Sequence, residues 1–95
     1  MTTSEFPDEQ IVRDLQDMAR LGFSVVEMIE YILIAGDYES DAAFPVVVYL
    51  ATAFQLPLMQ IREVERCRLF AGSISDDELD DLLLPGFWRA IGDGN

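Results

Sequence analysis

Apolar residues recur at helical spacing along most of the chain, with polar residues between them. Between Pro7 and Gly22, the residues Ile11, Leu15 and Met18 follow one another at intervals of four and three. This period lines the apolar side chains along one face of an α-helix, which the proline begins and the glycine ends. The same period returns in later segments, so the pattern predicts helices throughout the chain.

Two capping boxes mark the starts of further helices. Glu27 follows Ser24 by three residues, and Glu78 follows Ser75 by three. In such a pair the serine accepts a hydrogen bond from the first turn, and the glutamate accepts one from the backbone of the serine. Together with the proline and glycine boundaries, these pairs predict five helices, over residues 7–21, 25–35, 45–54, 57–71 and 76–84.

The helix predicted over residues 25–35 is apolar on nearly every side, apart from a stripe that holds Glu27 and Glu30. A helix that is apolar all round is buried, so we expect this one to be the central and most buried element. Gly36 ends it. The acidic loop 37–41 follows, and its last residues are placed to cap the next helix.

A twenty-residue stretch without charge, 42–61, raises the question of a transmembrane span. Pro45 and Pro57 divide it into pieces too short to cross a bilayer core of about 30 Å, so we expect buried core helices instead. The β-branched run 46–50 suits a strand as well as a helix. No other predicted strand is present to pair with it, which favours a helix over 45–54.

The helix that begins at Pro57 carries an apolar face whose residues step by three, and Pro85 with Gly86 is expected to break the helix predicted over 76–84. Phe87 and Trp88 then begin a last helical turn or two that packs an aromatic pair onto the body of the protein. The residues that step by three are Leu58, Ile61, Val64 and Cys67.

These elements predict an all-α fold, a compact single-domain bundle of five helices, or six if residues 87–91 form a helix of their own. The domain is expected to span residues 1–95, with fraying at 1–6 and 92–95.

The charge of the chain is strongly negative. Eighteen Asp and Glu residues stand against six Arg, with no Lys and no His, for a formal net charge of -12 at pH 7. The acids gather in residues 1–41 and 76–95, on either side of a nearly neutral middle. Phosphate backbones and anionic lipid headgroups repel such a chain, so we expect neither nucleic acid nor a membrane as a partner. A basic protein surface is its natural complement.

The missing residue types exclude much chemistry. Without His the chain has no imidazole base or metal ligand, and without Lys it has no Schiff base. Cys67 alone makes neither an internal disulfide nor a multi-thiolate zinc site, and its place on an apolar face predicts a buried, inert thiol. Residues 1–5 lack the basic and apolar runs of a secretory signal. We therefore expect a non-enzymatic, cytoplasmic protein with no cofactor.

Two acidic surfaces are candidates for binding a basic partner: the start of the helix predicted over 76–84, and the loop 37–41. Carboxylates there would pair with Arg or Lys, and a tyrosine would add rigid contact area. The alternative for both surfaces is an ordinary solvated face, and the spacing of an EF-hand calcium loop is absent. The candidate residues are Asp37, Tyr38, Glu39, Asp41, Asp76, Asp77, Glu78, Asp80 and Asp81.

Three expectations follow for the charged residues. Glu27 and Glu30 are expected to be solvated, and the arginines between residues 62 and 68 are expected to be neutralised by the glutamates among them. Reversal of four acids to Lys is expected to leave the fold intact and to abolish partner binding. These four are Asp76, Asp77, Asp80 and Asp81.

Residues 22–32, GFSVVEMIEYI, and residues 54–58, FQLPL, resemble the helix pattern of some small immunity proteins associated with nuclease toxins. The size and acidity of the chain are also similar to those of bacterial immunity proteins that neutralise bacteriocins and contact-dependent inhibition toxins. The resemblance covers residues 20–84. It implies one-to-one binding of a cognate toxin domain, with acidic residues blocking its active site or substrate face, and it transfers no binding residue to a numbered position.

Two alternatives remain open from the sequence. A DNA-mimic inhibitor would use the acidic surface to imitate phosphate spacing. A structural, adaptor or homodimeric protein would use an apolar groove around Phe87 and Trp88. Binding led by acids weakens as salt rises, whereas binding in an apolar groove does not.

Overall fold

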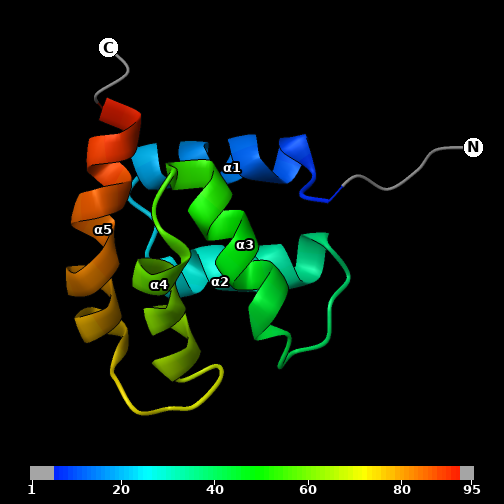
Figure 1. The fold of residues 1–95 in the computed structure, drawn as a ribbon, viewed down its shortest axis with the longest axis vertical. Helices are drawn as coiled ribbons and strands as arrows, with labels where there is room; N and C mark the ends of the chain where they lie inside the picture. Colours follow the sequence, from blue (N-terminus) through cyan, green and yellow to red (C-terminus); the bar gives the residue numbers. More distant parts are fainter. Residues whose placement is uncertain (1–5, 93–95) are drawn as a thin grey trace, which may run out of the picture.

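Helices and the loops between them make up the computed structural model, which describes residues 6–92 (Figure 1). No strand occurs in this part of the chain, which confirms the all-α prediction. Residues 1–5 and 93–95, expected to fray, lie outside the described residues. The elements are α1 (Glu9–Arg20), α2 (Val25–Ala35), α3 (Ala43–Phe54), α4 (Leu58–Ile61), the 3₁₀-helix η1 (Arg62–Arg66) and α5 (Asp76–Gly92).

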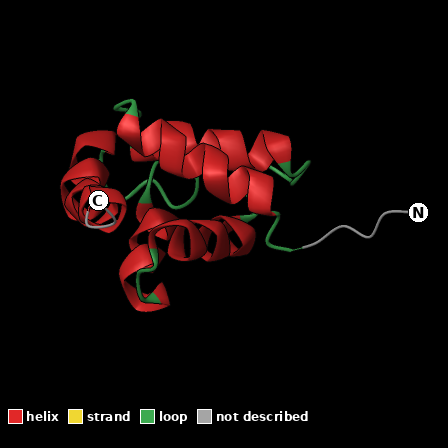
Figure 2. Cartoon of the chain, turned by 90° about the horizontal axis from the view of Figure 1, so that it is seen from above, coloured by secondary structure: helices red, strands yellow, loops and turns green. Residues whose placement is uncertain are grey.

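The helices cross in two directions. In Figure 1, α1 and α2 run across the molecule, while α3 and α5 cross them steeply, and Figure 2 shows the same bundle from above. Helix α3 contacts each of the other elements, so it is the central helix of the bundle. The expectation that residues 25–35 form the central helix was wrong. The physical reason is that α3 carries no charged residue at all, whereas α2 presents an acidic stripe to solvent.

The first two helices begin and end as their boundary residues predict, with one change. Asp8 is the N-cap of α1, and its carboxylate accepts a hydrogen bond from the Gln10 N–H at 2.8 Å. Pro7 therefore precedes the helix instead of opening it. Gly22 ends α1 with a φ of 90°, and Ser24 forms the predicted capping box at the start of α2.

Polar contacts from α1 and α5 fix the position of α2. The Tyr31 hydroxyl donates a hydrogen bond to the Asp14 carboxylate, which joins α2 to α1. Burial and this carboxylate raise the pKa of Tyr31 to about 12. At the other end of α2, the Val25 N–H donates a hydrogen bond to the Asp80 carboxylate of α5 at 2.9 Å. The orientation of α2, and of the residues it exposes, is thus set by both neighbours.

The segment after Pro57 is not one long α-helix, as the step of three had suggested. It forms the short α4 and then η1. A 3₁₀-helix has three residues per turn, so side chains three apart lie directly above one another, whereas in an α-helix they drift around the axis. Ile61, Val64 and Cys67 are all fully buried at this spacing. Leu58, the first residue of the predicted face, is exposed instead.

Helix α5 continues through the predicted break. Pro85 removes one intrahelical donor, which leaves the carbonyl of Asp81 without its usual partner, but both residues are exposed and water can take that role. Gly86 is buried, and a Cβ there would lie 3.3 Å from Cδ1 of Leu56. The glycine thus serves close packing inside the helix, and Gly92 closes α5 where fraying was expected.

The core joins all the helices. The rings of Phe54 and Phe87 stack with centroids 4.0 Å apart, which ties the end of α3 to α5. Phe87 is fully buried while Trp88 is half-exposed, so Phe87 packs onto the body and half of the Trp88 side chain stays accessible. Phe6, also expected to fray, packs edge-on against Tyr49. Cys67 is buried, as predicted.

The described residues form no helix that combines the length and the hydropathy needed to cross a membrane. The uncharged stretch 42–61 is instead divided between α3 and α4, as its two prolines predict.

Candidate functional site

The exposed stripe of α2 combines acidic and apolar side chains. Glu27, Glu30 and Ile34 follow one another at intervals of three and four, and all three are exposed. Glu27 closes the capping box of the helix, since its carboxylate accepts the Ser24 N–H at 2.8 Å. Ile34 is 80 % exposed, in the same stripe as the two acids. The solvated stripe predicted for α2 therefore ends in an isoleucine that the fold leaves uncovered.

The turn that ends α2 carries Asp37 in a left-handed conformation, with a φ of 58°. The Tyr38 N–H bonds to the Leu33 carbonyl at 2.9 Å, and the Asp37 N–H bonds to the Ile34 carbonyl at 3.1 Å. These two bonds form a Schellman motif, in which the left-handed position is most often a glycine. Here an aspartate holds that position, and its carboxylate is exposed beside the end of α2.

Tyr38 is an anchor of the acidic loop. A Cβ at Gly36 would collide with the Tyr38 ring, so the ring lies directly on the glycine backbone. Burial, followed by the neighbouring Tyr49, raises the pKa of Tyr38. The Tyr49 hydroxyl in turn accepts the Asp8 N–H at 2.8 Å. Tyr38 thus packs against the core near Tyr49 of α3, and its half-buried ring offers a partner less surface than the sequence suggests.

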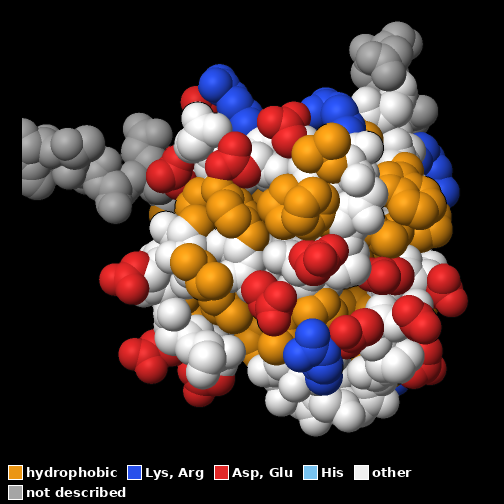
Figure 3. Space-filling model, turned by 180° about the vertical axis from the view of Figure 1, so that it is seen from behind, with side chains coloured by type: hydrophobic (Ala, Val, Ile, Leu, Met, Phe, Trp, Pro, Cys, Tyr) orange, Lys and Arg blue, Asp and Glu red, His pale blue; other side chains and the backbone are white. Residues whose placement is uncertain are grey.

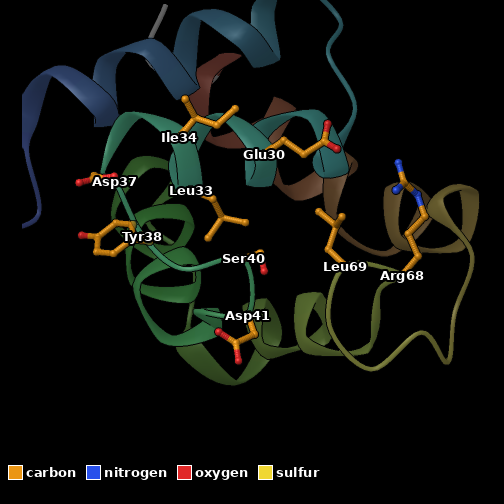
Figure 4. A pocket seen from close by; sticks show the side chains of 9 residues that line it. All are labelled: Glu30, Leu33, Ile34, Asp37, Tyr38, Ser40, Asp41, Arg68 and Leu69. Atoms are coloured by element: carbon orange, nitrogen blue, oxygen red, sulfur yellow. The ribbon is translucent and has the colours of Figure 1, made fainter.

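A groove opens beside the exposed stripe of α2 (Figure 4). Three segments build it: the end of α2, the loop 37–41, and Arg68 with Leu69, which follow η1. Its volume is about 880 Å³, within the usual range of binding pockets. We call it the acidic groove, and the residues that line it are Glu30, Leu33, Ile34, Asp37, Tyr38, Ser40, Asp41, Arg68 and Leu69.

The middle of the acidic groove is apolar. Leu33 and Leu69 are half-buried and pack against the hydrophobic core, so they are rigidly placed. Ile34, at the next position on α2, also lines the acidic groove, at its upper edge in Figure 4, and points away from Leu33. These side chains offer apolar surface that a partner can cover.

Charged residues surround this apolar floor. In Figure 4, Asp37 lies at the left edge and Asp41 at the bottom, while Glu30 and Arg68 lie toward the right. The guanidinium of Arg68 donates from Nε to the Asp76 carboxylate at 3.0 and 3.2 Å. Asp76 first, and Glu30 more weakly, raise the pKa of Arg68. The rim is thus acidic, with one cation that is already paired.

The Arg68–Asp76 ion pair links the acidic groove to the second predicted surface. We call that surface the α5 acidic turn, defined as Asp76, Asp77, Glu78, Asp80 and Asp81. The expected i,i+3 pairs between these glutamates and arginines thus do not include Arg68, which pairs with Asp76 instead. Arg62 and Arg66 do pair with Glu65 and Glu63, at 3.5 and 2.7 Å.

Three acids of the α5 acidic turn have structural roles. Asp76 pairs with Arg68, Glu78 closes the predicted capping box with Ser75, and Asp80 accepts the N–H that begins α2. The Ser75 hydrogen bonds lower the pKa of Glu78. Burial raises the pKa of Asp80, and the neighbouring acids add to that rise.

The remaining acids of the two predicted surfaces are exposed. Asp77 and Asp81 form no ion pair or side-chain hydrogen bond within residues 6–92, and Glu39 lies outside the lining of the acidic groove. Asp81 lines a shallower hollow of about 290 Å³ with Arg66, Ile74, Glu78 and Leu82. Sequence reasoning expected the fold to tolerate reversal of Asp76, Asp77, Asp80 and Asp81 to Lys. Because Asp76 and Asp80 have structural roles, we expect this reversal to disturb the fold at those two positions.

The side of the molecule opposite to the view of Figure 1 is shown in Figure 3. Apolar side chains gather in the middle of this face, and carboxylates lie among and around them.

The described residues contain no group of three or more potential His, Cys, Asp or Glu ligands for a metal ion. The chemistry that the acidic groove offers is ion pairing at its rim and apolar contact on its floor.

Comparison with protein-family models, with curated proteins and with solved structures finds no match for the chain.

Sequence reasoning found part of the acidic groove and missed the rest. The loop residues Asp37, Tyr38 and Asp41 were predicted as a candidate surface, and all three line the acidic groove. The groove residues of α2 and Leu69 were missed because they belong to segments predicted as core or solvated face. One signal was available: Ile34 stands four residues after Glu30, on the polar stripe of α2.

Proposed function

We propose that the chain is a non-enzymatic binding protein that inhibits a basic partner protein through its acidic groove. The single observation that carries the proposal is an apolar floor within an acidic rim, on a surface held rigidly by α2. Interfaces combine apolar contact, which supplies affinity, with complementary charge, which supplies specificity and fast association. The acidic groove offers both to a partner that carries Arg or Lys beside apolar side chains.

A protein fits this surface better than a nucleic acid or a second copy of the chain does. Phosphates and a second chain of net charge -12 are both repelled by the acidic rim. Apolar side chains on a partner would cover Leu33, Ile34 and Leu69, which water now reaches in part.

The form of inhibitor that we propose is an immunity protein, which neutralises a toxin domain of the nuclease type. A nuclease must present a positive face to its substrate, and a rigid acidic protein can occupy that face. The resemblance of residues 20–84 to immunity proteins supports this form. A DNA mimic is less well supported, because imitation of phosphates needs no apolar floor between the carboxylates.

The proposal is tested by capture of a partner on the immobilised chain from an extract of the source cell. The expected partner is basic, is released as salt rises, and loses its activity when the purified chain is added in equimolar amount. Partner binding that resists salt, or that leaves the activity of the captured protein unchanged, would contradict the proposal.

A pair of matched variants shows which acids matter. Asp37→Arg with Asp41→Arg reverses charge in the acidic groove, and Asp77→Arg with Asp81→Arg reverses the same amount outside it. All four residues are exposed, so both variants are expected to fold. Capture and inhibition should fail with the first variant and survive in the second. If the first variant inhibits like the unaltered chain, the acidic groove is not the binding surface.

A further inference from the structure

The acidic groove is suited to one particular element of the partner. We infer that it takes a basic amphipathic helix, which lays its apolar side chains on the floor and its Arg or Lys side chains on the rim. This inference rests on the proposed function and adds the shape and spacing of the bound segment.

A helix fits the acidic groove better than an extended segment because no sheet edge is present. Residues 6–92 contain no strand, so an added strand would find no ladder of free N–H and C=O groups to pair with. The backbone groups of α2 are already bonded to one another. A helix arrives with its own backbone hydrogen bonds made, so its burial leaves no backbone group unpaired.

The spacing of the rim matches two turns of a bound helix. Glu30 and Asp37 stand seven residues apart along α2 and its end, which is about 10 Å at the rise of a helix. Two basic residues at positions i and i+7 of the partner helix are separated by the same distance. Ile34 lies between Glu30 and Asp37 on α2, so the apolar residues of the partner fall at i+3 and i+4.

The probe for this inference is a synthetic peptide of about 14 residues, long enough to form a helix, with leucines at helical spacing and arginines seven residues apart. It is titrated into the full ¹⁵N-labelled chain while backbone amide shifts are recorded. The expected result is saturable binding, with shift changes at Leu33, Ile34 and Leu69 and along the loop 37–41.

Two control peptides separate shape from charge. One has the same composition with leucine and arginine alternating, which suits a strand, and the other replaces each arginine by glutamate. Both should bind at least roughly tenfold more weakly than the first peptide. Equal binding of the alternating peptide would overturn the inference of a helix.

Variants of the chain test the floor of the acidic groove. Ile34→Ser removes apolar surface at a residue that is 80 % exposed, so the fold should tolerate it. Leu82→Ser is the matched control, since Leu82 is an exposed leucine of α5 outside the acidic groove. Ile34→Ser should lower the affinity for the peptide roughly tenfold, and Leu82→Ser should leave this affinity unaltered. If both changes lower the affinity equally, the peptide does not bind on the apolar floor of the acidic groove.

The peptide experiment can give a negative result while the proposed function still holds. If the captured partner binds through Asp37 and Asp41 while none of the peptides binds, the inferred helix is wrong and the inhibitor proposal stands. If the same amides shift on concentration of the chain alone, a second copy occupies the acidic groove, and the inferred occupant is wrong.

Discussion

The carboxylate of Asp80 accepts a hydrogen bond from the backbone N–H of Val25 at 2.9 Å, across 55 positions of the chain. The first N–H groups of a helix have no partner within the helix, and its N-terminus favours negative charge. Asp80 supplies both a partner and a charge to the start of α2. Asp80, which belongs to the densest acidic run of the sequence, thus connects α5 to α2.

Replacement of Asp80 by Ala is expected to lower the free energy of unfolding by about 1 kcal/mol, because the Val25 N–H loses its acceptor. The measurement is urea denaturation followed by circular dichroism. Asp77→Ala on the same helix is the control, and a change within about 0.5 kcal/mol is expected there because Asp77 is exposed. If both variants lose the same stability, Asp80 has no special role as a cap.

The pH dependence of stability should carry the signature of Asp80. Burial and the neighbouring acids raise its pKa above the usual 3.8, so the folded state holds this proton more tightly than the unfolded state. The contribution of Asp80 to stability is therefore largest at low pH and falls as pH rises from 3.8 through the folded pKa. Asp80→Asn keeps an acceptor for Val25 without the charge.

The stability of Asp80→Asn relative to the unaltered chain should consequently rise as pH increases through that window, as measured by urea denaturation at a series of pH values. A difference between the two proteins that stays constant with pH would contradict the raised pKa of Asp80.

Gly36→Ala is expected to destabilise the protein by about 1–3 kcal/mol, because the new methyl group collides with the ring of Tyr38. The backbone of Gly36 has a φ of -88°, which any residue adopts, so the cost comes from crowding alone. Gly92→Ala is the control, since a Cβ at Gly92 meets nothing within 4 Å. Thermal unfolding of the two variants compares them, and equal melting temperatures would show that Tyr38 moves aside freely.

Asp37→Gly should separate stability from binding. Glycine adopts the left-handed backbone of position 37 without strain, so the free energy of unfolding should hold steady or rise by up to about 1 kcal/mol. Binding of the arginine-bearing peptide should weaken, because the rim of the acidic groove loses a carboxylate. Gln55→Gly is the matched control, since Gln55 is also left-handed, with a φ of 53°, and lies outside the acidic groove.

Gln55→Gly is expected to change stability in the same direction and to leave peptide affinity as it was. Equal peptide affinity in Asp37→Gly and the unaltered chain, measured by fluorescence titration, would mean that Asp37 takes no part in binding.

Local signals in the sequence predicted most of the fold. Ser24 and Ser75 begin helices with the capping partners expected of them, since capping depends only on residues within one turn. The failures came where packing decides the outcome. Pro85 is accommodated because it and Asp81, whose carbonyl loses its helical donor, are both exposed, and the buried Gly86 leaves room for Leu56.

The acidic groove was predictable only in part for the same reason. Asp37 and Asp41 were identified because acids in a loop are visible in the sequence. Leu69 and Arg68 reach the acidic groove through the path of η1, which no local pattern specified. Ile34 was a visible anomaly, an apolar residue on a polar stripe, and tertiary packing alone decided that residues 6–92 leave it 80 % exposed.

The central claim is that a basic partner binds in the acidic groove, and it is tested most directly by the backbone amide shifts of the ¹⁵N-labelled chain on addition of the captured partner. We expect the largest changes at Leu33, Ile34, Asp41 and Leu69, with smaller changes at Asp77 and Asp81. Changes centred on Asp77, Asp81 or Trp88, with the groove residues unmoved, would contradict the claim.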